Sequence, residues 1–396
     1  MKSIVNNTTM KTSRRKFLKN LSTSVAAYAT LGSKSWGNTV CSSIENPNEY
    51  KVFSEGKIGR VQLKNRLIKA ATLERAGQNG FPGDIYIQTI ENLASGGTGL
   101  VITGAMAVAQ TVVSETQIYI YDDKFISGLE KIAETVHLQD KANKVFAQIV
   151  HVDNSKSPSG INWSGKPTQG DYSIDQINDL IKCFSESIVR AKAAGFDGVE
   201  LNAHYQYFLS SFLSAQTNKR ADDYGGSMEN RVRLVKEIVQ QARIIVGDDF
   251  PIIIKLNCDD SFSLTTKSEY GTNIENFPLL AIEIEKAGFD AIELSGNTMI
   301  RKDINALEKE SYFENYANNL NIQIPVILTG GNRSLDKIED IFKKDKIDFF
   351  GFARPLIREP DLPKRWQEYG NKIKSECISC NSCLAASGPL RCMQKS

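Results

Sequence analysis

Residues 252–257, Ile-Ile-Ile-Lys-Leu-Asn, form the most informative stretch of this sequence. The stretch is short, rich in β-branched residues and apolar until Lys255, which is typical of a parallel strand buried on both faces. Similar short apolar runs recur along the chain, and with this one they cover residues 67–72, 99–105, 145–150, 198–202, 252–257, 291–295, 326–329 and 349–353. The sequence therefore predicts eight buried strands.

Each run is followed by a stretch with the amphipathic pattern of a helix. The predicted helices cover residues 84–95, 123–143, 174–194, 227–246, 273–286, 312–319, 335–344 and 361–370. Strict alternation of strands and helices predicts an α/β fold, a single-domain (β/α)8 TIM barrel. A doubly wound open sheet is the alternative. The dinucleotide fingerprint that often marks such a sheet is broken after the first strand, because Gly97 and Gly99 are followed by Ile102.

The composition is that of a globular protein. The chain has 396 residues, 41% of them apolar and 24% charged, and its 48 basic and 46 acidic residues give a net charge of +2. This balance argues against nucleic-acid binding, which favours a large basic excess. No apolar run is long enough to span a bilayer, so the sequence predicts no transmembrane segment.

The first 37 residues differ from the rest of the chain. They carry seven basic residues and no Asp or Glu, and Arg14-Arg15-Lys16-Phe17-Leu18 precedes a short, weakly apolar stretch at 21–32. This pattern predicts a twin-arginine export signal over residues 1–37, a periplasmic or other extracytoplasmic location, and a linker over 38–50. A disordered basic tail is the alternative. Without the signal, 41 basic residues face 46 acidic ones, so the remainder is mildly acidic.

The ends of the last two predicted strands suggest a phosphate site. In a (β/α)8 barrel the chemistry lies at the carboxyl ends of the strands, where Gly330-Gly331 and Ala353-Arg354 stand here. Small residues let backbone N–H groups approach a phosphate, and Arg354 can add a bidentate contact. A tight strand-to-helix turn is the alternative for the two glycines.

Several segments, in the same order along the chain, resemble the old yellow enzyme family. They are LKNR (63–66), ASGGTGL (94–100), FAQI (146–149), FLS (212–214), YGGSMENR (224–231) and GFARPL (351–356). The resemblance runs from about residue 50 to 392, and it is strongest for the branch with 2,4-dienoyl-CoA reductase and trimethylamine dehydrogenase. It implies an FMN-dependent oxidoreductase whose barrel, over residues 51–372, binds FMN.

The resemblance also implies roles for residues at the strand ends. Gln148 occupies the position of an amide that binds the flavin pyrimidine, and Lys255 stands where many members carry Arg near flavin N1 and O2. The backbone of Ala71, Thr72 and Ala105 is expected to line the flavin ring. The alternatives are a satisfied polar residue at a strand end for Gln148 and a surface salt bridge for Lys255.

The reaction centre departs from the family pattern. Typical members end the fourth strand with two histidines, followed by a tyrosine that supplies a proton. Aligned without gaps on residues 212–214, this chain places Asn202 and Tyr205 at the histidine positions and Tyr207 at the proton donor, while His204 falls out of register. Asn and Tyr can still donate to an oxyanion. The resemblance thus implies an activated alkene that is polarised by Asn202 and Tyr205, reduced by hydride from flavin N5 and protonated by Tyr207.

Four cysteines, Cys377, Cys380, Cys383 and Cys392, lie in a tail over residues 373–396. The resembled branch binds a [4Fe–4S] cluster just past the barrel, usually with wider gaps between the later cysteines. The gaps here are compatible with such a cluster. A zinc site, disulfides and a metal-free relic are the alternatives.

We expect a small-molecule substrate as the partner of an FMN enzyme of this kind. The larger family members carry a nucleotide-binding domain after the cysteines, and an exported protein is not expected to meet NADH or NADPH. We therefore expect a protein or membrane electron donor. Assembly into a homo-oligomer is compatible with the sequence. Two other functions compete with alkene reduction: a dehydrogenase of small amine-like substrates, and a barrel that binds flavin or another ligand without ene-reductase activity.

Overall fold

The computed structural model describes residues 49–110, 115–262, 268–302, 304 and 306–394. Contacts divide the chain into residues 1–42 and residues 43–396, and every described element belongs to the second unit. The predicted export signal and residues 38–48 of the predicted linker lie outside the described residues. Within the described part of the chain, no helix has the length and apolar character needed to cross a membrane.

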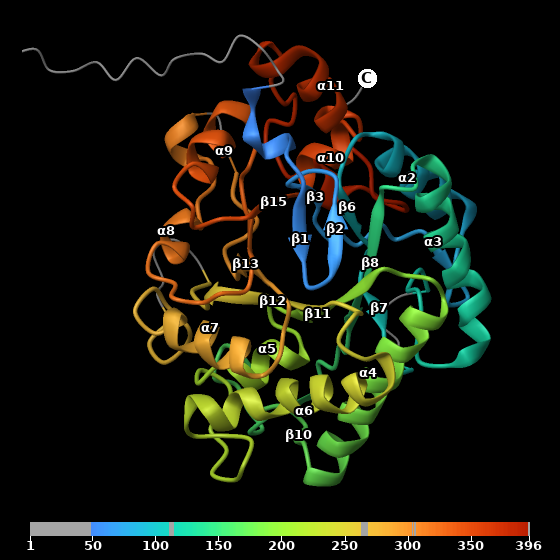
Figure 1. The fold of residues 1–396 in the computed structure, drawn as a ribbon. Helices are drawn as coiled ribbons and strands as arrows, with labels where there is room; N and C mark the ends of the chain where they lie inside the picture. Colours follow the sequence, from blue (N-terminus) through green and yellow to red (C-terminus); the bar gives the residue numbers. More distant parts are fainter. Residues whose placement is uncertain (1–48, 111–114, 263–267, 303, 305, 395–396) are drawn as a thin grey trace, which may run out of the picture. The chain divides into compact units, whose positions relative to one another are not determined.

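Eight parallel strands close into a barrel, as the sequence predicts. They are β3 (Leu67–Lys69), β6 (Leu100–Ile102), β8 (Lys144–Val150), β11 (Gly198–Ala203), β12 (Ile252–Asp259), β13 (Ile292–Gly296), β14 (Val326–Thr329) and β15 (Phe349–Phe352). Each strand pairs with the next in this order, and β15 pairs with β3 to complete the ring. Figure 1 shows the strands at the centre and helices around them. The alternative of an open sheet is therefore wrong.

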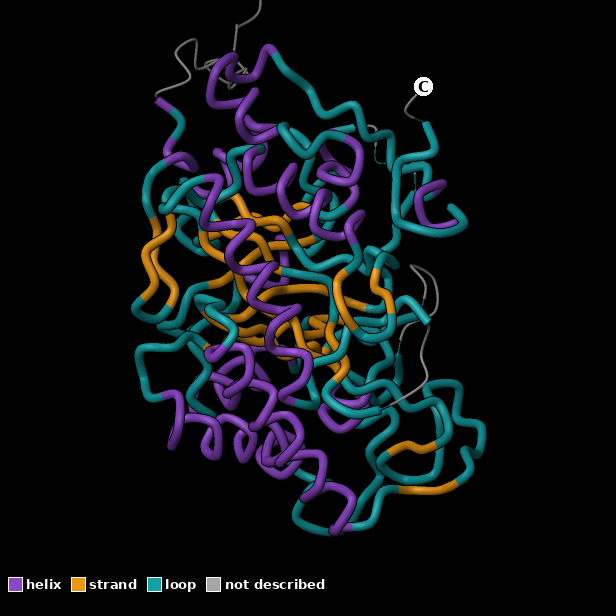
Figure 2. The backbone as a smooth tube through the Cα atoms, turned by 90° about the vertical axis from the view of Figure 1, so that its right-hand side faces the viewer, coloured by secondary structure: helices purple, strands orange, loops and turns teal. Residues whose placement is uncertain are grey.

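The helices cover the outside of this ring, and in Figure 2 they flank the strands. They are α2 (Asp84–Ser95), α3 (Ile126–Gln139), α4 (Ile174–Ala193), α5 (Phe208–Leu213), α6 (Met228–Val246), α7 (Phe277–Lys286), α8 (Glu314–Ala317), α9 (Leu335–Phe342), α10 (Arg354–Arg358) and α11 (Leu362–Tyr369). The short helices α5 and α10 were not predicted. Helix α7 begins four residues later than expected, because the Asn273 side chain accepts from the backbone N–H groups of Glu275 and Asn276 and forms a turn instead.

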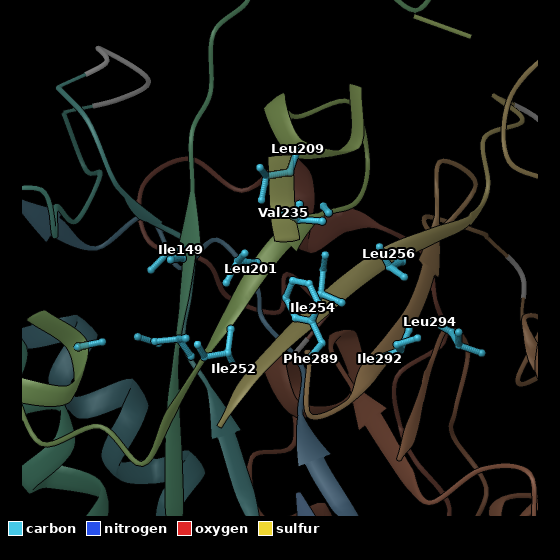
Figure 3. Packing of buried hydrophobic residues seen from close by; sticks show 14 of the residues in the cluster. Ile149, Leu201, Leu209, Val235, Ile252, Ile254, Leu256, Phe289, Ile292 and Leu294 are labelled. Carbon is cyan, nitrogen blue, oxygen red and sulfur yellow. The ribbon is translucent and has the colours of Figure 1, made fainter. Parts of the chain in front are cut away.

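Side chains of the strands alternate between two apolar layers. On β12, Ile252, Ile254 and Leu256 belong to the outer cluster, which also contains residues of the helices, as Figure 3 shows for Val235 of α6. Ile253 belongs to the inner cluster inside the barrel. Because this period of two continues along the strand, Lys255 also faces the barrel interior.

A hairpin of β1 (Gly56–Ile58) and β2 (Val61–Leu63) was not predicted, and it closes the end of the barrel at which the strands begin. Its Ile58 and Leu63 are fully buried in the inner cluster. The remaining short strands are β4 (Gly77–Gln78), β5 (Phe81–Pro82), β7 (Met106–Ala107), β9 (Lys156–Ser157) and β10 (Gly170–Asp171). With one end plugged by apolar side chains, the carboxyl ends of the strands are left for a site.

Candidate functional site

A cavity of about 410 Å³ lies at the carboxyl ends of the barrel strands. Its volume is in the range of small-molecule and cofactor sites. All twelve residues predicted to bind cofactor or act in catalysis line it: Ala71, Thr72, Ala105, Gln148, Asn202, Tyr205, Tyr207, Lys255, Gly330, Gly331, Ala353 and Arg354. The fold therefore brings together residues that stand far apart in the sequence.

Gln148 and Asn202 are joined in the floor of this cavity. The Gln148 Nε2 donates to Glu200 Oε1 at 2.6 Å, and the Gln148 Oε1 accepts from Asn202 Nδ2 at 3.1 Å. All three side chains are buried. The hydrogen bonds fix the orientation of both amides, so each can present its remaining donor or acceptor capacity in one direction.

Lys255 forms a buried ion pair. Its Nζ lies 2.7 Å from Glu293 Oε1, and the two side chains are 4% and 0% exposed. Burial alone would lower the pKa of Lys255, but Glu293 and Glu200 together outweigh it and raise this pKa. The alternative of a surface salt bridge is therefore wrong, because Lys255 points into the barrel.

The sequence reasoning missed Glu200 and Glu293. Glu200 stands two residues before Asn202 on β11, and Glu293 stands two residues before Ser295 on β13. Alternation along each strand places these residues on the inner face, and that signal could have found them. Their contact with each other depends on the closure of the barrel, which no local pattern shows.

Tyr205 has an unusual backbone conformation. Its φ of 58° lies in the left-handed region, which is costly for a residue other than glycine. Asn257 holds it there, because its Oδ1 accepts from Tyr205 N–H and its Nδ2 donates to Tyr205 O, both at 2.9 Å. The Tyr205 and Tyr207 rings are 5.7 Å apart between centroids. Burial and then the neighbouring Tyr205 raise the pKa of Tyr207, so its hydroxyl keeps its proton.

His204 also lines the cavity, although the ungapped alignment had set it aside. Alternation explains this correction, because residues 202 and 204 share the inner face when β11 is extended by one residue. The ring is buried, and its Nδ1 finds no partner among the described residues. Burial and then the charge of Lys255 lower the pKa of His204 well below its usual value, so the ring is neutral.

The Gly330-Gly331 turn and Arg354 fit a phosphate. Gly331 has a φ of 80°, and a Cβ at this position would come within 2.7 Å of the Tyr312 ring. Only glycine is therefore accommodated, which leaves backbone open to the cavity. The Arg354 Nη1 donates to Arg301 O at 2.6 Å and to Asn381 Oδ1 at 2.5 Å, which holds the guanidinium at the cavity wall.

The neighbouring wall, after β3 and β6, contains residues expected to contact the flavin ring through their backbone. The hydroxyl of Thr72 is already engaged, because it accepts from Lys69 Nζ at 2.8 Å and donates to Glu74 Oε1 at 2.7 Å. The Ala105 carbonyl accepts from Gln117 Nε2 at 2.5 Å. These contacts fix the wall of the cavity on the side of β3 and β6.

A second, smaller cavity adjoins the first. All four cysteines of the tail line it, and Arg354, Ile357 and Ser379 line both cavities. The described cysteines are free thiols, so the alternative of disulfides finds no support in the tail. No three His, Cys, Asp or Glu side chains in the described part of the chain are grouped so that they could hold a metal ion.

Known proteins similar to this chain include longer ones. An NADH oxidase of Thermoanaerobacter brockii is 31% identical over 353 residues, which cover 83% of this chain and 52% of the relative. A metal reductase of Desulforamulus reducens is 31% identical over 350 residues, which cover 84% and 51%. This chain thus spans about half the length of these two curated relatives. The structure of a 2-naphthoyl-CoA reductase with 2-naphthoyl-CoA has a TM-score of 0.75 at 25% identity, covering 84% of this chain and 54% of that one.

A family model also matches the barrel itself. It describes the NADH:flavin oxidoreductase / NADH oxidase family and matches residues 51–372, which contain all eight barrel strands and all twelve predicted residues of the large cavity. The match covers most of the chain. This chain belongs to the NADH:flavin oxidoreductase / NADH oxidase family.

Proposed function

We propose that this chain is an FMN-dependent oxidoreductase that reduces an activated alkene or a related electrophile. The observation that carries the proposal is the convergence of a phosphate cradle, a buried amide, a buried cation and a protonated tyrosine on one cavity. When bound, FMN would supply hydride from its N5 position. The cradle of Gly330, Gly331, Ala353 and Arg354 would hold its phosphate.

The chain's own residues would polarise and protonate the substrate. Negative charge develops on a carbonyl oxygen as hydride reaches the conjugated β-carbon, so donors aimed at that oxygen lower the barrier. Asn202 keeps one amide N–H for this purpose beside the bond it gives to Gln148, and the Tyr205 hydroxyl can supply another. Tyr207, whose raised pKa keeps it protonated, would deliver a proton to the α-carbon.

The names of two similar proteins support the reductive direction that we propose. The similar proteins include a metal reductase and a 2-naphthoyl-CoA reductase, whose names both describe electron delivery to an acceptor. We therefore propose a conjugated carbonyl compound as the substrate class. As a separate part of the proposal, we propose a protein or membrane electron donor, because a protein exported by the predicted signal is not expected to meet NADH or NADPH.

An anaerobic reoxidation assay tests this function. The protein is loaded with FMN, reduced by light, and mixed with a conjugated enone; we expect flavin absorbance to return at a rate that rises with enone concentration. Bleaching of the oxidised flavin by small amines, without a response to enones, would instead establish an amine dehydrogenase. No response to either class would indicate a binding barrel without this chemistry.

The four cysteines of the tail are given no role in the proposed reaction. Its four cysteines share one cavity, but the described side chains are not grouped for a metal, so the residues as placed do not fit a [4Fe–4S] cluster. Iron, zinc and sulfide analysis of the purified protein tests this directly. Iron and sulfide in cluster stoichiometry would show that the tail rearranges around a cluster.

We also propose that residues 1–37 direct export by the twin-arginine route. The support is the Arg14-Arg15 pair with the acid-free basic segment around it. Replacing both arginines with lysine keeps the charge but removes the pair that the export receptor reads. We expect the variant to stay in the cytoplasmic fraction while the wild type is found outside it, and equal distribution of the two would contradict export by this route.

A further inference from the structure

Two fully buried carboxyl groups lie behind the lining of the large cavity. Glu200 on β11 and Glu293 on β13 are both 0% exposed, and each carboxyl influences the pKa of the other as a hydrogen-bonding neighbour. Within the described residues, no hydrogen bond of good geometry reaches Glu200 Oε2 or either oxygen of Glu293, although Lys255 forms an ion pair with Glu293 Oε1 and the Thr329 hydroxyl also influences Glu293. Two ionised carboxylates repel each other in such a contact, whereas one shared proton supplies the missing donor, so we expect the pair to hold one proton.

The surrounding groups decide which carboxyl carries the charge. Burial and then the Glu293 carboxylate raise the pKa of Glu200 well above its usual value. Burial acts in the same direction on Glu293, but the ammonium of Lys255, 2.7 Å away, together with hydrogen bonds from Glu200 and Thr329, outweighs it and lowers the pKa of Glu293. The proton therefore lies on Glu200, and the negative charge lies on Glu293.

The charges of Glu200, Glu293 and Lys255 cancel one another. Besides Lys255, the other titratable group of the described chain that acts on the cluster is His204, which is neutral. Gln148 contributes a neutral hydrogen bond to Glu200. One negative charge on the carboxyl pair thus faces one positive charge on Lys255, and the buried cluster is neutral as a whole.

We propose that Glu293 is a redox-tuning residue, whose carboxylate neutralises Lys255 and thereby lowers the reduction potential of the FMN bound beside it. This inference rests on the proposed function. Hydride from a donor adds two electrons and one proton to the flavin and leaves it with one additional negative charge. An unpaired Lys255 would attract that charge strongly, whereas a Lys255 already paired with Glu293 attracts it less. Glu200 supports the effect by keeping the carboxyl pair at a single negative charge.

The experiment compares potentials of FMN-loaded variants. Glu293→Gln removes the negative charge, and Glu200→Gln replaces a neutral acid with a neutral amide of similar shape. A double variant prevents Glu200 from taking over as the counter-ion. Glu339→Gln is the matched control, because Glu339 is also buried and paired with a lysine, Lys343, but does not line or adjoin the cavity.

We expect the Glu293→Gln and double variants to favour the reduced flavin at least tenfold, which is about 30 mV for a two-electron couple. Glu200→Gln and Glu339→Gln should stay near the wild-type potential. A double variant with the wild-type potential would overturn the inference. An equal rise of the reduction potential in Glu200→Gln and Glu293→Gln would also overturn the inference, because both carboxyls would then be ionised and the pair would hold no proton.

The wild type offers a second test that does not depend on the folding of a charge variant. Its infrared spectrum at neutral pH should contain the C=O stretch of a protonated buried carboxyl, and Glu200→Gln should remove this band. Absence of the band from the wild type would contradict the shared proton. A protein that takes up no FMN would refute the proposed function instead, and the infrared test would still stand.

Discussion

The barrel interior consists of two layers made by the same strands. The lower layer, which faces the hairpin, is apolar and contains Ile68, Leu100, Phe146, Ile253, Ile327 and Phe349. The upper layer, which faces the cavity, contains Gln148, Glu200, Lys255 and Glu293. On β8 and β12 a step of two residues leads from one layer to the other. Identical backbone geometry therefore supports two environments, and side-chain chemistry alone makes them different.

The two layers differ in what burial costs. Apolar side chains of the lower layer gain free energy when they leave water, and their packing fixes the barrel. The polar groups of the upper layer lose hydration and must be satisfied by one another, so they contribute little net stability. We therefore expect changes in the lower layer to affect unfolding, and changes in or above the upper layer to affect binding, potential and rate.

The largest expected effect is kinetic and lies above the upper layer. Tyr207→Phe removes the proposed proton donor, and loss of a general acid typically costs about 10²- to 10⁴-fold in rate. We expect enone-driven reoxidation of the reduced flavin to slow by this factor, with FMN affinity and unfolding unchanged. Tyr224→Phe is the matched control, because Tyr224 donates to Glu237 outside the cavity. Equal rates in wild type and Tyr207→Phe would remove Tyr207 from the mechanism.

The next largest effect lies in the lower layer. Phe146→Ala leaves a cavity in the fully buried core, for which we expect a loss of about 3–5 kcal/mol in the free energy of unfolding. Folded protein should still bind FMN as the wild type does. Gln148→Leu, two residues further on β8, should cost only about 1–3 kcal/mol by leaving Glu200 with one donor fewer, yet weaken FMN binding. Denaturant titration measures the stability of both variants, and FMN titration measures their affinity. A larger loss of stability in Gln148→Leu, with FMN affinity lost only in Phe146→Ala, would contradict the distinction between the two layers.

His151 tests whether a buried polar group outside the cavity weakens the fold in acid. Burial lowers the pKa of His151 from 6.5 to about 4. Between these values the unfolded chain binds a proton that the folded chain does not, so stability falls as the pH drops, by about 1.4 kcal/mol per unit from this residue. Stability profiles of wild type and His151→Asn should therefore diverge in this window. Parallel profiles would show that His151 titrates normally in the folded state.

The smallest expected effect concerns the strained turn above β11. A left-handed φ costs a non-glycine residue roughly 1 kcal/mol, so Tyr205→Gly should raise the free energy of unfolding by about that amount. The same change removes a proposed oxyanion donor and should raise the enone concentration needed for half-maximal reoxidation. A variant that is less stable than the wild type would show that the Tyr205 ring contributes more by packing than its backbone costs.

Most of the architecture could be predicted from the sequence. Apolar runs such as 252–257 located all eight barrel strands, and helix α2 has the predicted bounds, because burial on both faces leaves a strong local pattern. The hairpin β1–β2 and helices α5 and α10 were not predicted, because each is too short to show a hydrophobic periodicity. The predicted residues of the cavity were found through a family resemblance at strand ends, and the closed barrel brings them together.

Other parts of the site could not be predicted from local patterns. Glu200 and Glu293 contact each other only because the barrel closes, and the shared proton follows from that contact. The ungapped alignment gave His204 no role in the site, whereas the alternation of side chains along the strand places it in the cavity. Tyr205 occupies a left-handed turn that a residue other than glycine rarely adopts, and the Asn257 clamp that holds it is distant in sequence.

FMN titration of the purified protein tests the assignment of the upper cavity most directly. We expect one FMN to bind per chain with quenched flavin fluorescence, and we expect binding to weaken strongly when Gly331→Val fills the cradle and Arg354→Ala removes the guanidinium. A colourless protein that takes up no FMN would contradict an FMN site in this barrel. Uptake that is undiminished in both variants would contradict the placement of the phosphate at Gly331 and Arg354.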